Sequence, residues 1–223
     1  NKEYRRQRQM CIRDSDSNDR ANYVKNKAAQ VSAIHVLQAG AMTKGELGEE
    51  LSDIAGMAAA GVPVLSEDGK SVMKASLCKQ AMDEAVKAGL PIFDHCEDMS
   101  LRGNGCMNED ENAKRLGLPG ICNSTEDTIA ARDSLLAIET GAKLHLCHCS
   151  TKGVAIMMKM LKAEGVENVT AEVCPHHFIL TSDDIERDDP NYKMNPPLRT
   201  RKDVDALIPL VIRYMRMLSL IHI

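Results

Sequence analysis

The sequence predicts an α/β fold in the form of a partial (β/α)8 barrel, and three observations lead to this prediction. Short apolar runs alternate with helix-length segments between residues 16 and 209. This alternation is typical of βαβ units and a parallel sheet. Acidic residues or histidines follow successive strands, and in a barrel every strand ends on the same face. A doubly wound sheet gathers ligands only near its switch point, so the pattern favours the barrel.

The first half of the predicted barrel is delimited by helix caps and glycines. An apolar run ends at Gly40, which predicts a buried strand. Thr43 and Glu46 form a capping-box pattern, so a helix is expected to start there and to stop at Gly61. A second helix closes at Gly89. The predicted elements are strands at 34–40, at 62–65 and from 91, and helices from 43 to 61 and at 72–88.

The second half of the predicted barrel repeats the same alternation. Ser150 and Thr151 precede a periodic apolar segment and are suited to opening a helix. A β-branched run from Val169 to Val173 is typical of a buried strand. The predicted elements are a helix at about 125–139, a strand at 144–147, a helix to residue 164 and a strand at 169–173.

The composition limits the classes of protein that the chain can represent. The 223 residues are 43% apolar and only 3% aromatic, so the core must be aliphatic. A net charge of −4 argues against nucleic-acid binding through bulk positive charge. The chain has no apolar run of about 18 residues and no signal-peptide pattern, so no membrane span or export is expected. Eight cysteines spread through apolar segments indicate reduced thiols and a cytoplasmic location.

The two ends of the chain differ from its middle. Residues 1–15 hold five basic and two acidic residues without a defensible period, and the apolar end of the chain has no helix cap. The strings RQRQMCIRDS and LSLIHI resemble translated sequencing adapters. We therefore expect residues 1–15 and 210–223 to be non-native or disordered, and residues 16–209 to form an incomplete barrel. The alternative is a basic arm and a frayed C-terminal helix.

Three residues at predicted strand ends are the candidate metal ligands. His95 and His148 each end a strand, and Asp68 follows the preceding strand. Imidazole and carboxylate ligands suit Zn²⁺, which lowers the pKa of a bound water and polarises carbonyl groups. The alternative for a single strand-end histidine is a hydrogen bond to a backbone carbonyl.

Other histidines and cysteines receive structural roles. His145 cannot face inward together with His148 from an undistorted strand, so it is expected to be packed or to lie on the outer face. Cys147 and Cys149 are expected to act as small buried apolar residues. For His176 and His177, support of other groups and of the loop is favoured over direct ligation.

Asn195 is the candidate substrate-binding residue. It precedes two prolines that force an extended loop, and its amide both donates and accepts hydrogen bonds. An asparagine that simply starts a turn is the alternative. The acidic run 108–111 is expected to be a solvated loop or a helix start.

With these residues in place, the middle of the chain resembles the bacterial dihydroorotases, which are related to allantoinases and hydantoinases. The resemblance extends over about residues 16–207, in the family's order and approximate spacing. The stretches that carry it are GAMTKGELGEEL (40–51), VLSEDGKSV (64–72), FDHCED (93–98), HLCHCSTK (145–152), AEVCPHHF (171–178) and YKMNPPLR (192–199).

The resemblance implies a metal-dependent amidohydrolase barrel that interconverts L-dihydroorotate and N-carbamoyl-L-aspartate in pyrimidine synthesis. It implies two Zn²⁺ ions in the complete enzyme, with Asp68 bridging them and Glu67 as a neighbour that is easily mistaken for it. His95 and His148 correspond to the two histidines that bind one zinc. Asn195 corresponds to the residue that hydrogen-bonds the small-molecule substrate.

The chain also departs from the family pattern. The family's His-x-His pair, and its catalytic aspartate in an Asp-His-Ala-Pro-His motif, do not occur in this sequence. No residue of this chain is therefore assigned as the catalytic acid or base. We expect the chain to be a fragment that shows no dihydroorotase activity by itself.

Three alternatives stay open. The first is another cyclic amidase, such as an allantoinase or hydantoinase. The second is a non-catalytic scaffold that assembles with aspartate carbamoyltransferase; a homodimer or such a complex is also possible for an active enzyme. The third is a zinc-binding or redox module, which predicts zinc that is lost when Cys147 and Cys149 are replaced by serine.

Overall fold

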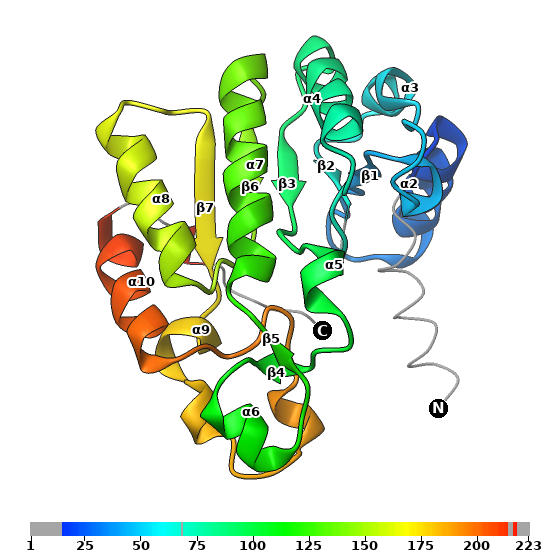
Figure 1. Ribbon diagram of the computed structural model, residues 1–223. Helices are drawn as coiled ribbons and strands as arrows, with labels where there is room; N and C mark the ends of the chain where they lie inside the picture. Colours follow the sequence, from blue (N-terminus) through cyan, green and yellow to red (C-terminus); the bar gives the residue numbers. More distant parts are fainter. Residues whose placement is uncertain (1–14, 68, 214–215, 218–223) are drawn as a thin grey trace. The chain divides into compact units, whose positions relative to one another are not determined.

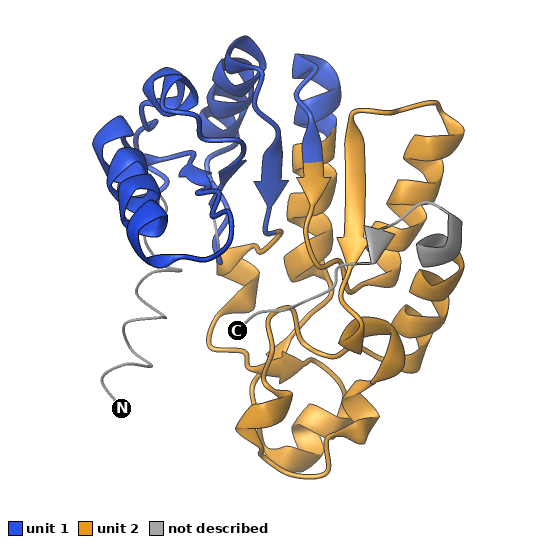
Figure 2. Ribbon diagram, turned by 180° about the vertical axis from the view of Figure 1, so that it is seen from behind, with its two compact units in different colours: residues 1–95, 135–144 blue, residues 96–134, 145–223 orange. Residues whose placement is uncertain are grey.

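The computed structural model describes residues 15–67, 69–213 and 216–217 (Figure 1). The chain divides into two compact units (Figure 2), and each is described by itself. The first unit comprises residues 1–95 and 135–144, and the second comprises residues 96–134 and 145–223.

The first unit contains a parallel sheet in the strand order β1-β2-β3 (Figure 1). In register, Gly40 of β1 lies opposite Leu65 of β2, and Leu65 lies opposite Ile92 of β3. The elements of this unit are α2 (Asn18–Val31), β1 (Gly40–Ala41), the 3-10 turn η1 (Lys44–Glu46), α3 (Ile54–Ala59), β2 (Leu65–Ser66), α4 (Ala75–Ala88), β3 (Ile92–Asp94) and the end of α7 (Ser124–Thr140).

Helix α4 shows how the sequence builds this unit. Its apolar residues recur at helical spacing and are buried on one face. The helix ends at Gly89, whose φ of 71° is left-handed, a conformation that glycine adopts without steric cost. The predicted stop is therefore confirmed. The buried residues of α4 are Leu77, Cys78, Ala81, Met82 and Ala85.

Three predicted elements of this unit differ from the structure. The helix expected from residue 43 to 61 is only the turn η1 followed by α3. Positive φ angles at Gly45, Glu46 and Gly48 break it, and Asp53 caps a new start by accepting a hydrogen bond from the Gly56 N–H. The strand expected at 34–40 is reduced to β1, which begins at the last predicted residue. The strand expected at 62–65 is β2, which likewise begins at the last predicted residue, Leu65.

The second unit has the strand order β6-β7-β8, with a separate parallel pair formed by β4 and β5. Helix α8 packs against β7, and α10 packs against α8 and α9 (Figure 1). Besides the first part of α7, its elements are α5 (Met99–Arg102), β4 (Met107–Asn108), α6 (Glu111–Leu116), β5 (Gly120–Ile121), β6 (Leu144–Leu146), α8 (Lys152–Ala163), β7 (Val169–Val173), α9 (His176–Ile179), η2 (Ser182–Asp184), η3 (Pro190–Tyr192), α10 (Arg201–Arg213) and β8 (Arg216–Met217).

More of the elements predicted from the sequence are confirmed in the second unit than in the first. The strand predicted at 169–173 is β7 with identical bounds, and the helix predicted at about 125–139 is α7. The Thr151 hydroxyl accepts a hydrogen bond from the Val154 N–H and caps α8, as predicted. The run 108–111 is predicted to be a solvated loop or a helix start. Its second half is a helix start, because Asp110 caps α6. Asn108 differs from the prediction, since it is buried in β4.

The predictions for the chain ends fall mostly outside the described residues. Residues 1–14, 214–215 and 218–223 are not described. Ser15 is described and buried, and its carbonyl accepts a hydrogen bond of 3.0 Å from the Ala41 N–H. Helix α10 extends through Arg213. Among the described helices, none has the length and apolar character needed to cross a membrane.

Candidate functional site

Three polar residues at the end of β3 and just after it are buried. Asp94, His95 and Glu97 are 2%, 6% and 3% exposed. The Ser71 hydroxyl donates a hydrogen bond of 2.5 Å to the backbone carbonyl of His95. His95, a predicted metal ligand, therefore lies in a buried position at the carboxyl end of a parallel strand, with its backbone anchored.

His148 follows β6 in a left-handed backbone conformation, with a φ of 37°. Residues other than glycine adopt this conformation rarely, and it often marks functional positions. Immediately afterwards, the Cys149 N–H donates a 2.8 Å hydrogen bond to the carbonyl of Glu172 in β7. The turn at the half-buried His148 thus redirects the chain as it leaves the strand.

A buried carboxylate from α7 holds the loop that follows His148. Glu126 accepts hydrogen bonds from the Ser150 N–H at 2.8 Å and from the Thr151 N–H at 3.3 Å. The Ser150 hydroxyl also donates to it. Burial raises the pKa of Glu126, and the charge of Arg199 and the Ser150 hydrogen bonds oppose this shift.

Arg199 is the buried cation that accompanies Glu126, with 3.7 Å between Nη2 and Oε2. Its Nε donates to the Ser150 hydroxyl at 3.0 Å, and its Nη1 donates to the Asn108 side-chain oxygen at 3.2 Å and to the Ile121 carbonyl at 2.8 Å. Arg199 therefore joins β4, β5 and the loop after His148. It does so from the NPPLR segment.

Asn195, the predicted substrate-binding residue, is exposed and held by a buried acid. Its side-chain nitrogen donates a 3.0 Å hydrogen bond to Oε1 of Glu97. The same Oε1 lies 2.7 Å from Nε of Arg102. The Asn195 amide is thus oriented by a carboxylate that lies two residues after His95 in the sequence.

Asp68 is the third predicted metal ligand and lies outside the described residues. Its neighbour Glu67 is described and is 2% exposed. Glu67 accepts hydrogen bonds from the Met42 N–H at 3.0 Å and the Thr43 N–H at 3.1 Å, and the Thr43 hydroxyl donates to its other oxygen. Burial raises the pKa of Glu67. Both carboxylate oxygens of Glu67 therefore accept hydrogen bonds from Met42 and Thr43, which directly follow β1.

The structure assigns His95 to the first unit and His148 to the second, so each predicted ligand is described within its own unit. In the described part of the chain, two other groups bring potential ligand atoms within 4.8 Å of one another. These groups are Cys174, His176 and His177, and His145, Cys147 and Glu172.

His145 and the two cysteines after it agree in part with their predicted roles. His145 is partly buried, with Nδ1 2.8 Å from the Thr170 hydroxyl and Nε2 3.2 Å from the Glu172 carboxylate. Cys149 is buried as predicted, whereas Cys147 is only half-buried. Burial raises the pKa of the Cys149 thiol.

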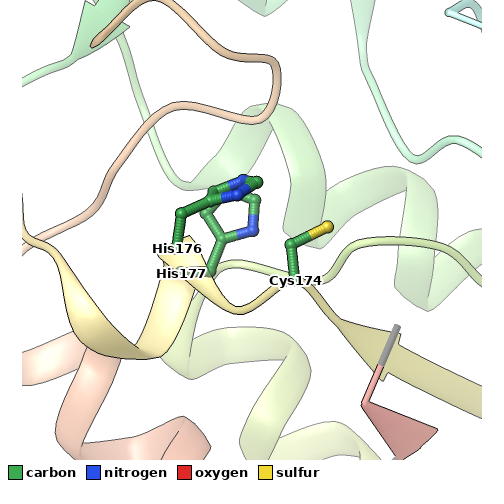
Figure 3. A group of neighbouring side chains, drawn as sticks. All are labelled: Cys174, His176 and His177. Atoms are coloured by element: carbon green, nitrogen blue, oxygen red, sulfur yellow. The ribbon is translucent and has the colours of Figure 1, made fainter. Parts of the chain in front are cut away.

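His177 supports a loop, as predicted, through a 3.0 Å hydrogen bond between its Nε2 and the Pro196 carbonyl. Burial lowers its pKa to about 3. Burial also raises the pKa of Cys174 to about 12. The His176 and His177 rings meet edge to face, with centroids 4.2 Å apart (Figure 3).

Sequence reasoning did not find the roles of Glu126 and Arg199. The two residues are far apart in the chain, and a glutamate in the first turn of a helix is normally explained by the helix dipole. The only available sequence signal is the position of Arg199, two residues after the stiff Pro196-Pro197 pair. That position does not identify a partner.

Comparisons of the sequence identify relatives. A family model described as dihydro-orotase-like matches residues 10–154. A dihydroorotase from Caldanaerobacter subterraneus subsp. tengcongensis is 45% identical over 193 residues, which cover 86% of this chain and 44% of that protein. A dihydroorotase from Staphylococcus epidermidis is 42% identical, with coverage of 86% and 45%. The chain thus spans somewhat less than half the length of these curated relatives.

Solved structures confirm the predicted fold class. The L-hydantoinase (dihydropyrimidinase) from Arthrobacter aurescens matches with a TM-score of 0.68 over 90% of this chain and 45% of that one. A D-hydantoinase structure matches with a TM-score of 0.57 over 73% of this chain and 38% of that one. At 19% and 24% identity, these likenesses show the fold alone, a partial α/β barrel.

Proposed function

We propose, from the premise that this chain belongs to the dihydroorotase-like family, that its protein hydrolyses L-dihydroorotate reversibly to N-carbamoyl-L-aspartate in pyrimidine biosynthesis. The observation that carries the proposal is the extent of the family match. Residues 10–154 include the ends of β2, β3 and β6, the strands that the predicted metal ligands follow.

The donor set fits a zinc site. Asp68, His95 and His148 would offer one carboxylate and two imidazoles, the ligand types that zinc accepts in hydrolases. The burial of His95 supports this role, as does the unusual backbone conformation of His148. When bound, zinc would polarise the ring carbonyl and lower the pKa of water.

Asn195 is the residue that we propose for substrate binding. A cyclic amide presents an N–H donor and carbonyl acceptors, and an asparagine side chain can complement either. The hydrogen bond from Asn195 to Glu97 supports this role because it fixes the direction of the exposed amide. Glu97 is then a positioning residue for Asn195.

The test is an activity assay of the protein expressed from its complete natural reading frame. We expect zinc-dependent turnover of dihydroorotate that exceeds turnover of hydantoin or allantoin. His95→Asn and His148→Asn should each lower kcat and the zinc content at least tenfold. Asn195→Ala should mainly raise KM, because it removes a binding group.

The control variant is His35→Asn, which replaces an exposed histidine and should leave both zinc and turnover unchanged. Preferred turnover of hydantoin or allantoin would overturn the proposed substrate. Full zinc content in both ligand variants would overturn the proposed metal site. The 223-residue chain assayed alone should show no turnover, because the catalytic aspartate of the family pattern does not occur in it.

Location and assembly follow from the same proposal. A cytoplasmic location is supported by Cys78, Cys96, Cys106, Cys122, Cys147, Cys149 and Cys174, which are all free thiols. A homodimer or a complex with aspartate carbamoyltransferase is proposed on the family resemblance. Light scattering of the purified protein, with and without that partner, tests both assemblies.

A further inference from the structure

A cluster of sulfur and nitrogen ligands lies where β7 leads into α9. Cys174 directly follows β7, and His176 and His177 are the first two residues of α9 (Figure 3). One ligand atom from each residue lies within 4.8 Å of the other two. Cys174 and His177 are each 2% exposed, whereas His176 is half-buried. The cluster therefore has a buried side and an accessible side.

The hydrogen bonding of His177 leaves one ring nitrogen for a ligand. Nε2 lies 3.0 Å from the Pro196 carbonyl, which can only accept, so Nε2 carries the hydrogen. Nδ1 is buried and has no hydrogen-bond partner among the described residues. A buried nitrogen without a partner is costly and needs an explanation. Histidines that bind metals commonly donate their other N–H to a carbonyl in this way.

The second ligand group of the structure does not share this property. Both ring nitrogens of His145 already have partners, Thr170 on one side and Glu172 on the other. A metal there would have to break an existing contact. Both groups combine histidine with cysteine. Only the group with His177 has a buried ring nitrogen without a hydrogen-bond partner among the described residues, so it can bind an ion without breaking an existing contact.

We propose that Cys174, His176 and His177 bind a borderline-soft divalent cation of the zinc class. A thiolate and two imidazoles supply three ligands of a tetrahedral site and leave the fourth position to water or another group. Binding forms one metal–sulfur and two metal–nitrogen bonds, and the Cys174 thiol releases its proton to solvent. The site uses none of Asp68, His95 and His148, so it is independent of the proposed function.

Cobalt titration of the metal-free 223-residue chain tests the site. Co²⁺ is the probe because a thiolate ligand gives it a ligand-to-metal charge-transfer absorption. We expect this band to saturate at one equivalent and to disappear when Zn²⁺ is added. Cys174→Ser should abolish the band. His176→Ala, at the accessible side of the cluster, should weaken cobalt binding at least tenfold while the circular dichroism spectrum is retained.

Cys147→Ser is the matched control, since Cys147 is the thiol of the second ligand group, and it should leave the band unchanged. Cobalt bound by His95 and His148 has no thiolate ligand and gives no such band, so failure of the proposed function cannot imitate this result. Absence of the band in the folded chain would overturn the proposal. Its retention in Cys174→Ser, or unchanged affinity in His176→Ala, would also do so.

Discussion

Glu67 in the first unit and Glu126 in the second are buried glutamates in similar settings. Each accepts two backbone N–H groups from the segment that follows a strand, β1 for Glu67 and β6 for Glu126. Glu67 also accepts one hydroxyl from that segment, and Glu126 accepts two. Burial raises the pKa of both. Each carboxylate thereby fixes a loop at the carboxyl end of a parallel strand, the edge at which barrel enzymes place their chemistry.

The two glutamates differ in the charge beside them. Arg199 lies beside Glu126 and opposes the rise of its pKa, whereas the charge of another acid, Glu46, adds to the rise of the pKa of Glu67. A carboxylate without a nearby cation can relieve its burial by taking up a proton, but a buried guanidinium cannot lose one. The loop after β6 is therefore held by an ion pair, and the loop after β1 by hydrogen bonds.

The largest expected effect is that of Arg199→Met, which should lower the free energy of unfolding by about 4 kcal/mol at neutral pH. The substitution leaves Glu126 without its cation and leaves the acceptors of Asn108 and Ile121 without their donor. Urea denaturation of the chain measures the loss. Arg201→Met, at an exposed arginine, should change stability by less than about 0.5 kcal/mol. Equal losses in both variants would contradict the ion-pair account.

Glu126→Gln should have a smaller effect, about 2 kcal/mol. The glutamine oxygen can still accept from the Ser150 and Thr151 N–H groups, and Arg199 keeps its hydrogen bonds to Asn108 and Ile121. What is lost is the countercharge of a guanidinium that stays ionised. Denaturation of the single variants and of the double variant with Arg199→Met gives the coupling energy. Strict additivity would show that the pair does not interact.

Glu67→Gln should change stability by less than about 1 kcal/mol, because among the described residues no buried cation loses its partner. The amide oxygen can accept from Met42 and Thr43, and the amide nitrogen can donate to the Thr43 hydroxyl. Glu49→Gln, at an exposed glutamate, is the control for the loss of one surface charge. A loss as large as that of Glu126→Gln would remove the distinction between the two loops.

The smallest expected effect is the pH dependence of the difference in the free energy of unfolding between the wild-type chain and Glu67→Gln. The folded-state pKa of Glu67 is raised above its ordinary value of 4.5, so the folded chain binds more protons than the unfolded chain at intermediate pH. Its contribution is fully present below pH 4.5 and is lost as the pH rises through the folded-state pKa. The wild-type chain should therefore lose stability relative to Glu67→Gln as the pH rises from 4.5 through the folded-state pKa. The opposite slope would show a lowered pKa.

The regular elements of the fold were predictable, and the loops that join them were less so. β7 has the bounds that its β-branched run predicts, and α4 stops at Gly89. The long helix predicted from Thr43 does not form, because the positive φ angles around Glu46 depend on tertiary contacts that periodicity does not report. In part, these contacts are those of Thr43 with Glu67.

The places of the candidate site residues in the fold were predictable, whereas their metal-binding and substrate-binding roles stay predictions. The spacing of His95, His148 and Asn195 places each after a strand or before a stiff loop, and the structure agrees with those positions. Glu126 and Arg199 could not be found in this way, because buried charged residues have the same sequence appearance as exposed ones. Their pairing depends on the folded structure, which joins distant parts of the chain.

The contacts of Arg199 determine when the buried network around Glu126 can be completed during synthesis of the chain. The ribosome releases Glu126 and Ser150 long before Arg199, yet all three share one buried network. Until Arg199 emerges, the carboxylate of Glu126 has no guanidinium beside it, so the nascent loop lacks a partner that its final form requires. The segment that carries His148 therefore reaches its complete set of contacts only late in translation, after the strands on either side of it have been made.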